Sequence, residues 1–294
     1  MTRPLPGPLP SWRSLLFVPV ISERFLAKAH ERGADAIILD LEDSILPSQK
    51  DMARAAIAAA VPRVAQRGAD VTVRINRPLE LAIPDIAAAV MPGVAALMLP
   101  KVMGPEHVRL LSEVVTAREE ALGMTVGHTR FLALIESPAA LPHLYAIAAE
   151  PRMAGMSVGG EDMATELGAI PSADSMYVYA MMGLAACRTA GILPMGSMGQ
   201  LAKIDDLESY RAGLQRGRAL GFTTASCIHP AQVPIINKEY GASAEEVDRA
   251  RRLIAAFDAS GAGAVAFEGS MIDLPVVERA RRLIARAASW KGVR

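Results

Sequence analysis

Eight short apolar segments recur along the 294-residue chain about 30 residues apart, which is the length of one strand–helix unit. Most are continuously apolar rather than alternating, as parallel strands are when both of their faces are covered. Segments with helical spacing, such as SERFLAKAHERGA, lie between them. The pattern favours an α/β protein built as a (β/α)8 TIM barrel over an open doubly wound sheet. The apolar segments are SLLFVPV (14–20), AIILDLED (36–43), DVTVRIN (70–76), ALMLPKV (96–102), RFLALIES (130–137), GMSVGGED (155–162), GILPMGSM (191–198) and FTTASCIHP (222–230).

The chain continues beyond what eight such units need. Two further helical stretches are predicted at 243–258 and 274–289, separated by the glycine-bearing segment SGAGAVAFEGSMID, which we expect to be flexible. We expect residues 1–230 to form the barrel core with a proline-rich N-terminal arm. Residues 231–294 then supply the last barrel helix and a C-terminal extension that packs on the barrel or reaches a neighbouring subunit.

Composition excludes several classes of protein. The 31 basic and 31 acidic residues cancel, so no surface for nucleic acid is indicated. No apolar run reaches the roughly 18 residues of a membrane span. Prolines interrupt the N-terminus, so it lacks the continuous apolar region of a secretory signal. Cys187 and Cys227 lie outside any CxxC spacing, and no base is evident that would activate Cys227. We therefore expect buried free thiols in a cytoplasmic protein.

Polar side chains gather where the predicted strands end. In a TIM barrel the active residues lie at the C-terminal ends of the strands. A charged side chain at an apolar strand end is costly unless it is paired or bound to a metal, so the sequence predicts an active site there. The polar residues at these positions are Asp40, Glu42, Asp43, Arg74, Asn76, Lys101, Glu136, Glu161, Asp162 and His229.

Glu136 and Asp162 follow consecutive strands, so their carboxyl groups should be neighbours. Mg²⁺ takes one or two carboxylates and completes its octahedron with water and substrate oxygens, which this pair would allow. Glu161 and Asp162 point to opposite sides if the segment is extended, so only one of them faces a metal. The alternative is that Asp162 serves as the N-cap of the next helix.

Arg74 lies inside an apolar strand and needs an anionic partner. One interpretation is a salt bridge to Asp40 or Glu42. The other is that its guanidinium holds a substrate carboxylate or a developing enolate. We expect a structural ion pair between Lys101 and the acids of the second strand, and a packing or capping role for His229, which precedes a proline.

From RSLLFVP to the tail GSMIDLPVVERARRLI, the sequence resembles the citrate lyase β-subunit (CitE-like) family, also called the HpcH/HpaI aldolase family. The motifs that carry the resemblance are GADAIILDLEDS, VRIN, LPKV, ALIES, GGEDMATELGA, CIHPAQV and GSMIDLP. The resemblance implies a Mg²⁺-dependent carbon–carbon lyase acting on a β-hydroxyacyl-CoA thioester such as citramalyl-CoA or malyl-CoA. A class II aldolase that releases pyruvate from a 2-keto-4-hydroxy acid, an acyl-CoA thioesterase and a non-catalytic barrel remain as alternatives.

The resemblance also implies roles for individual residues. Glu136 and Asp162 are similar to the family's metal ligands, and Arg74 and Glu136 to its substrate contacts. Asp273 in GSMIDLP is similar to an acid that relatives insert into a neighbouring subunit's site, which implies a homo-oligomer such as a trimer. The alternative for Asp273 is a cap on the last helix. The chain departs from the family after LFVP, where it reads VISERF in place of a Gly-Asn-like turn.

Overall fold

The structure, a computed structural model, describes residues 8–198 and 205–290. Within them, eight parallel strands form one sheet in the order β7-β6-β5-β4-β3-β2-β1-β8. Each predicted apolar segment overlaps one strand, and β4 and β6 begin two residues before their segments. The bounds are β1 Ser14–Pro19, β2 Ala36–Asp40, β3 Asp70–Arg74, β4 Val94–Leu99, β5 Arg130–Ile135, β6 Met153–Val158, β7 Leu193–Met195 and β8 Ala225–Cys227.

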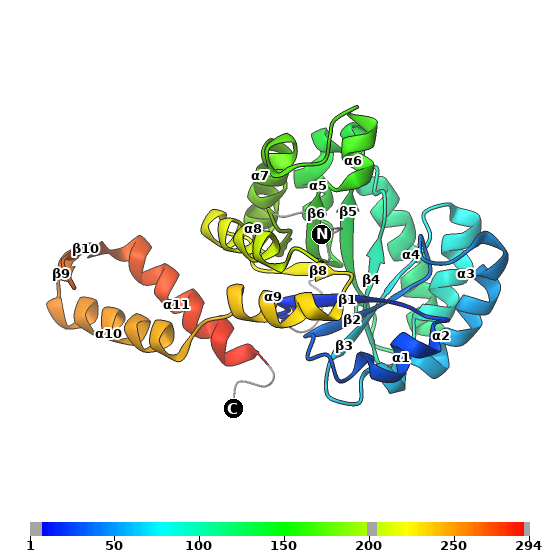
Figure 1. The fold of residues 1–294 in the computed structure, drawn as a ribbon, viewed down its shortest axis with the longest axis horizontal. Coiled ribbons are helices and arrows are strands. Elements are labelled where there is room, and N and C mark those ends of the chain that lie inside the picture. The colour runs from blue at the N-terminus through cyan, green and yellow to red at the C-terminus, as the bar shows by residue number, and fades with distance from the viewer. Residues whose placement is uncertain (1–7, 199–204, 291–294) are drawn as a thin grey trace.

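The sheet closes on itself, and the predicted (β/α)8 barrel is confirmed (Figure 1). Met195 of β7 forms a parallel bridge with Thr224, the residue before β8. The N–H of Gly196 donates to the carbonyl of Thr224 at 2.8 Å. The two end strands of the sheet therefore meet, as in a barrel.

Helices follow each strand and cover the outside of the barrel (Figure 1). Side chains on one face of the strands, including Leu15, Ile38 and Met98, fill the barrel interior. Side chains on the other face, such as Ile37 and Leu97, pack under the helices. Burial on both faces explains why the strand segments are apolar without alternation. The helices are α1 Glu23–Ala29, α2 Lys50–Val64, α3 Leu79–Ala89, α4 Pro105–Ala121, α5 Leu144–Ala148, α6 Glu161–Glu166, α7 Ala173–Ala190, α8 Leu207–Leu220 and α9 Val233–Glu239, with short 3-10 helices η1 Pro47–Gln49, η2 Pro138–His143 and η3 Pro230–Gln232.

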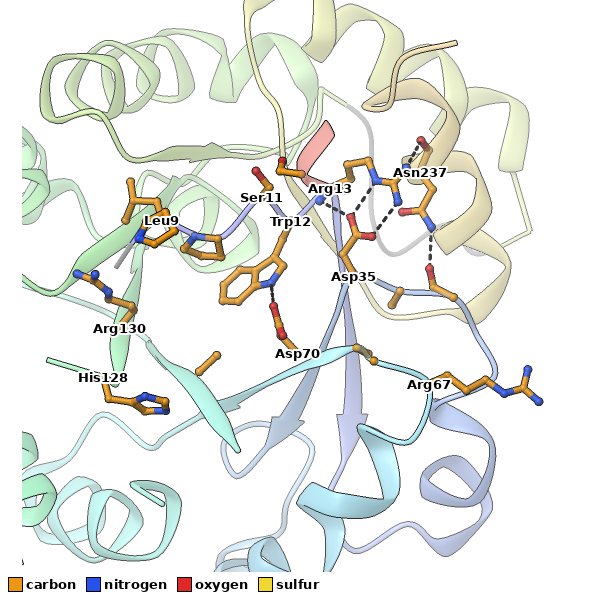
Figure 2. Close-up of a pocket in the computed structure, with 18 of the residues that line it drawn as sticks. Leu9, Ser11, Trp12, Arg13, Asp35, Arg67, Asp70, His128, Arg130 and Asn237 are labelled. Atoms are coloured by element: carbon orange, nitrogen blue, oxygen red, sulfur yellow. Dashed lines mark hydrogen bonds and ion pairs between the residues drawn. The ribbon is translucent and has the colours of Figure 1, made fainter. Parts of the chain in front are cut away.

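The N-terminal end of the barrel is crossed by the segment before β1 (Figure 2). The indole N–H of Trp12 donates to Asp70 Oδ2 at 2.7 Å. The Arg13 guanidinium donates to both carboxylate oxygens of Asp35, at 2.9 and 2.8 Å. These pairs border a cavity of about 960 Å³. This end is opposite to the one where TIM-barrel chemistry takes place. The hydrogen bond and the ion pair fix the segment that leads into β1.

The C-terminal extension, residues 244–289, projects away from the barrel (Figure 1). It consists of α10 Ala244–Ser260, β9 Ala264–Phe267, β10 Ser270–Asp273 and α11 Leu274–Ser289. The two strands pair antiparallel around Glu268 and Gly269, both with positive φ, as a two-residue type I′ hairpin requires. A small apolar core that includes Leu253, Ile272 and Val277 joins the hairpin to the helices. The expectation of a flexible linking segment is therefore wrong.

In the part of the chain that the structure describes, no helix has the length and apolar character needed to cross a membrane.

Candidate active site

Four of the polar residues predicted at strand ends converge at the C-terminal end of the barrel. Arg74 at the end of β3, Glu136 just after β5, and Glu161 and Asp162 on α6 line one cavity of about 320 Å³. Phe17 of β1 and Met195 of β7 line it as well, so the cavity lies over the barrel mouth. Arg74 therefore lies at the mouth, where its position at a strand end predicts it.

Arg74 is held by acids from the second strand and the loop after it. Its Nε and Nη2 donate to the two carboxylate oxygens of Asp40 at 2.7 and 2.8 Å. Its Nη1 lies 2.8 Å from Glu42 Oε2 and 3.0 Å from Asp43 Oδ2. The guanidinium stacks on the ring of Phe17, 4.8 Å from its centroid. The ion pairs that we considered as an alternative are present, and they also aim the guanidinium at the cavity.

Charge and burial compete in this group of acids. Burial alone would raise the pKa of Asp40, but the hydrogen bonds and charge of Arg74 outweigh it and lower that pKa. For Glu42 burial dominates: it raises the pKa to about 8, against the charge of Arg74 and with added repulsion from Asp43 and Glu136. A carboxyl group whose pKa is raised by burial in this way is common at functional sites.

Lys50 fixes the loop that carries these acids. Its ammonium donates to the carbonyls of Leu41 and Glu42, at 2.7 and 2.6 Å, and to Asn76 Oδ1 at 2.7 Å. Three acceptors from two loops are fixed by one cation, so the loop that carries the acids keeps its shape. Sequence reasoning missed Lys50 because it starts helix α2 and does not end a strand.

Glu136 and Asp162 form an acidic pair at the mouth. Glu136 Oε2 accepts the backbone N–H of Lys101 at 3.1 Å. Burial raises the pKa of Glu136, and the charge of Asp162 raises it further, against the N–H of Lys101. Two carboxylates that repel one another across a cavity are suited to bind a cation.

Two expectations about this pair are corrected. The N-cap of α6 is Gly160, and no side chain caps that helix, so Asp162 is not the N-cap. The ion-pair partner of Lys101 is Asp162, whose Oδ2 lies 3.4 Å from the ammonium, rather than an acid of the second strand. The reason is the strand order: β4 lies beside β5, and the end of β5 is close to the start of α6.

The donor set fits Mg²⁺. Among the described residues no group of three or more His, Cys, Asp or Glu side chains is placed to hold a metal. Two carboxylates with open positions for water and substrate oxygens are what Mg²⁺ commonly uses. A closed site built from nitrogen and sulfur ligands, as structural zinc prefers, does not fit this part of the chain.

Asp273 does not join Arg74, Glu136 and Asp162 within one chain. It ends β10 and is the N-cap of α11, with Oδ1 accepting the N–H of Val276 at 3.4 Å. Its side chain is exposed on the C-terminal extension, and it does not line the cavity at the mouth of its own barrel. The capping alternative is therefore present in the structure.

His229 and the two cysteines have structural roles. The Nδ1 of His229 accepts the N–H of Ala231 at 3.2 Å and caps η3, which confirms the capping role. Cys227 and Cys187 are buried free thiols, and burial raises the pKa of each to about 12. Neither is a nucleophile at neutral pH, as expected.

A second cavity of about 800 Å³ adjoins the mouth and shares Arg74 and Phe17 with the first. Basic side chains from α1 and the turn after it, Arg24, Lys28 and Arg32, line this cavity with the half-exposed ring of Phe25. We call these three basic residues the α1 strip. Sequence reasoning missed it, although the four-residue spacing of Arg24 and Lys28 places these two on one face of α1.

A TIM barrel with an arginine and paired carboxylates at its mouth defines the class of this protein, a barrel enzyme with its site at the C-terminal end of the strands. Residues 13–230 match the model of the HpcH/HpaI aldolase/citrate lyase family. The chain belongs to this family, and its relatives identify it as a lyase.

Similar proteins cover almost the whole chain. Citrate lyase subunit beta of Leuconostoc mesenteroides subsp. cremoris is 32% identical over 285 residues, which are 94% of this chain and 93% of that protein. An L-malyl-CoA/beta-methylmalyl-CoA lyase of Cereibacter sphaeroides is 32% identical over 97% of both chains. The crystal structure of protein CitE from Mycobacterium tuberculosis in complex with magnesium, acetoacetate and coenzyme A has a TM-score of 0.73 at 30% identity, and covers 94% of this chain and 97% of that one.

Proposed function

We propose that the protein is a Mg²⁺-dependent carbon–carbon lyase that cleaves, or in reverse forms, a β-hydroxyacyl-CoA thioester such as citramalyl-CoA or malyl-CoA. The observation that carries the proposal is the convergence of Arg74, Glu136 and Asp162 on one cavity at the barrel mouth. The similarity to a malyl-CoA lyase, and to a structure that contains magnesium and coenzyme A, supports the choice of metal and substrate class.

Glu136 and Asp162 would hold the Mg²⁺ ion. The bound ion would polarise the oxygens of the acid half of the substrate. Arg74 faces the same cavity. When a base takes the proton of the β-hydroxyl and the carbon–carbon bond breaks, the hydroxyl carbon becomes the carbonyl of the oxo-acid product and the bond electrons stay on the acyl-CoA enolate, whose negative charge the fixed guanidinium stabilises. Because Asp40 and Glu42 already orient Arg74, no reorganisation is needed during the reaction.

The α1 strip supports a coenzyme A substrate. Coenzyme A carries a diphosphate and a further phosphate, and Arg and Lys side chains bind such groups. Arg24, Lys28 and Arg32 line the cavity next to the mouth, with Phe25 available to an aromatic base. These side chains offer phosphate contacts although the chain lacks the turn usual in relatives after the first strand.

Asp273 supplies the acid/base that protonates the enolate carbon, or deprotonates it in the reverse direction. Since it does not line the mouth of its own barrel, we assign it to the site of a neighbouring subunit in a homo-oligomer such as a trimer.

The substrate class is tested by an assay with citramalyl-CoA, malyl-CoA and the corresponding free acids, each with Mg²⁺ or with EDTA. We expect Mg²⁺-dependent release of pyruvate or glyoxylate together with acetyl-CoA, and no free thiol. Lys28→Met should raise KM for the thioester, because it removes one cation from the α1 strip. Free coenzyme A as the first product would identify a thioesterase instead. Pyruvate release from a 2-keto-4-hydroxy acid without coenzyme A, assayed alongside the thioesters, would identify a pyruvate-releasing aldolase.

Arg74→Lys is expected to lower kcat/KM by roughly 100-fold. The planar guanidinium binds both oxygens of Asp40 while it faces the substrate, and a lysine ammonium cannot make these contacts at the same time. Steady-state kinetics on the best thioester measures the loss. Arg63→Lys is the matched control, since Arg63 forms an exposed ion pair with Glu23 and neither residue lines the mouth or the adjoining cavity. Wild-type activity in Arg74→Lys would show that Arg74 is purely structural.

A further inference from the structure

Lys101 contacts both of the carboxylates that we assign to the metal. Its backbone N–H donates to Glu136 Oε2 at 3.1 Å, and its ammonium lies 3.4 Å from Asp162 Oδ2. Glu136 follows β5 and Asp162 lies on α6, so the two acids come from different elements. One residue at the end of β4 therefore bridges them.

The backbone of Lys101 has an uncommon conformation that serves this contact. Its φ is 49°, in the left-handed region, and among the described non-glycine residues only Glu268 of the C-terminal hairpin also has a positive φ. A side chain in this region is unfavourable unless the surrounding structure imposes it, and such residues cluster at functional sites. The chain uses lysine here where glycine would fit the backbone, which indicates that the side chain has a role.

The ammonium of Lys101 and the guanidinium of Arg74 are the two positive charges that act on Glu136, and the Lys101 ammonium is the one paired with Asp162. Burial lowers the pKa of Lys101, but the charges of Asp162, Glu42 and Asp43 outweigh it and raise that pKa. The side chain is nevertheless 42% exposed, so it can leave Asp162 without crossing the protein interior. The Lys101 ammonium is thus attracted to Asp162 by charge, and its exposure allows it to move away when another cation binds.

We propose that Lys101 is a positioning residue that exchanges with the divalent ion. In the metal-free protein its ammonium holds Asp162 near Glu136, and it is released from Asp162 when the ion binds. Its backbone N–H keeps Glu136 in place in both states. The inference rests on the proposed function, from which the metal-binding role of Glu136 and Asp162 is taken.

The exchange has a measurable consequence for metal affinity. A divalent ion has to displace the ammonium from Asp162 and then remain near its positive charge. Removal of the ammonium should therefore tighten metal binding, whereas loss of a merely structural lysine would leave the affinity unchanged or weaken it. Coulomb's law for a single and a double charge about 6 to 12 Å apart in water, the separation left once the ammonium has moved off Asp162, indicates a gain of roughly three- to ten-fold.

The test measures Mn²⁺ affinity by calorimetry in the full-length protein and its variants. Lys101→Met should bind Mn²⁺ roughly three- to ten-fold more tightly than the wild type. Lys101→Arg, which keeps the charge, should stay near the wild type. Lys238→Met is the matched control, because Lys238 is exposed on α9 and does not line the mouth. Lys101→Gly removes the ammonium without backbone strain, so this variant should also bind Mn²⁺ more tightly. It provides an independent test if the Met variant misfolds.

A second readout is thermal stability. Without metal, Lys101→Met should melt below Lys101→Arg, because its two carboxylates have lost their cation. Saturating Mn²⁺ should then raise its melting temperature by more than that of the wild type. Unchanged or weaker Mn²⁺ binding in folded Lys101→Met and Lys101→Gly would overturn the exchange and leave the proposed function standing. Absence of Mn²⁺ binding in the wild type would overturn both.

Discussion

Glu136→Gln is expected to lower lyase activity by at least about 1,000-fold while the protein remains folded. The substitution removes one of two carboxylates that would hold the metal, and it keeps an oxygen that can accept the N–H of Lys101. Loss of the ion removes the charge that polarises the substrate, which is worth several kcal/mol. Mn²⁺ binding measured by calorimetry should be lost together with activity.

The stability of Glu136→Gln carries a pH signature. The pKa of Glu136 in the folded chain is raised by burial, so the folded state binds this proton more tightly than the unfolded state does. Without metal, the wild type therefore loses stability relative to the variant as the pH rises above about 4, where a free glutamate ionises. Thermal melts in EDTA should show the variant equal to the wild type at low pH and more stable at neutral pH.

Glu113→Gln is the control for this experiment, since Glu113 is exposed on α4 and does not line the mouth. It should leave activity, Mn²⁺ binding and the melting temperature unchanged. Retention of more than about a hundredth of the wild-type activity by Glu136→Gln would contradict the assignment of Glu136 to the metal.

The barrel was predictable because its strands are buried on both faces. Ile37 and Ile38 are adjacent in sequence, yet one packs under the helices and the other fills the barrel. Burial of both faces requires apolar residues at successive positions, and the number and spacing of the resulting segments indicate the fold. Since the ends of barrel strands are also where chemistry occurs, the search for polar residues there found Arg74, Glu136 and Asp162.

The supporting residues were not predictable by the same argument. Lys50, Arg24 and Lys28 lie on helices and Arg32 in the turn after one, where a basic residue is usually only solvated. Their role depends on which loop each helix follows. The partner of Lys101 depends on the strand order and on its left-handed backbone conformation. That conformation could not be predicted, because a lysine and not a glycine occupies the position. In the C-terminal extension, Gly269 indicated flexibility, whereas the structure uses it to close a hairpin.

Asp273 raises the question of which barrel it serves. It lies on the C-terminal extension, which projects away from its own barrel (Figure 1). The extension has a small core of its own, so it is a preformed arm rather than a loose tail. Near Asp273, Met271 and Leu274 are exposed, as side chains are that pack against another surface. Cyclic oligomers allow each subunit to place such an arm over the next.

Mixing Arg74→Ala with Asp273→Ala should restore activity that neither variant has alone. A site is intact when its barrel comes from the Asp273→Ala chain and its arm from the Arg74→Ala chain. With random exchange of equal amounts in a ring, roughly a quarter of the sites meet this condition. The mixture should therefore reach about a quarter of the wild-type rate per site, measured after subunit exchange has been verified with differently tagged chains.

The matched control replaces the Asp273→Ala partner with the double variant Arg74→Ala/Asp273→Ala. No chain in that mixture has an intact barrel, so no activity should return even though the subunits exchange equally well. A mixture of the two single variants that exchanges fully and stays inactive would show that Asp273 serves its own barrel or none. Sedimentation that finds a monomer at assay concentration would exclude the shared site, because a site built from two chains requires their contact.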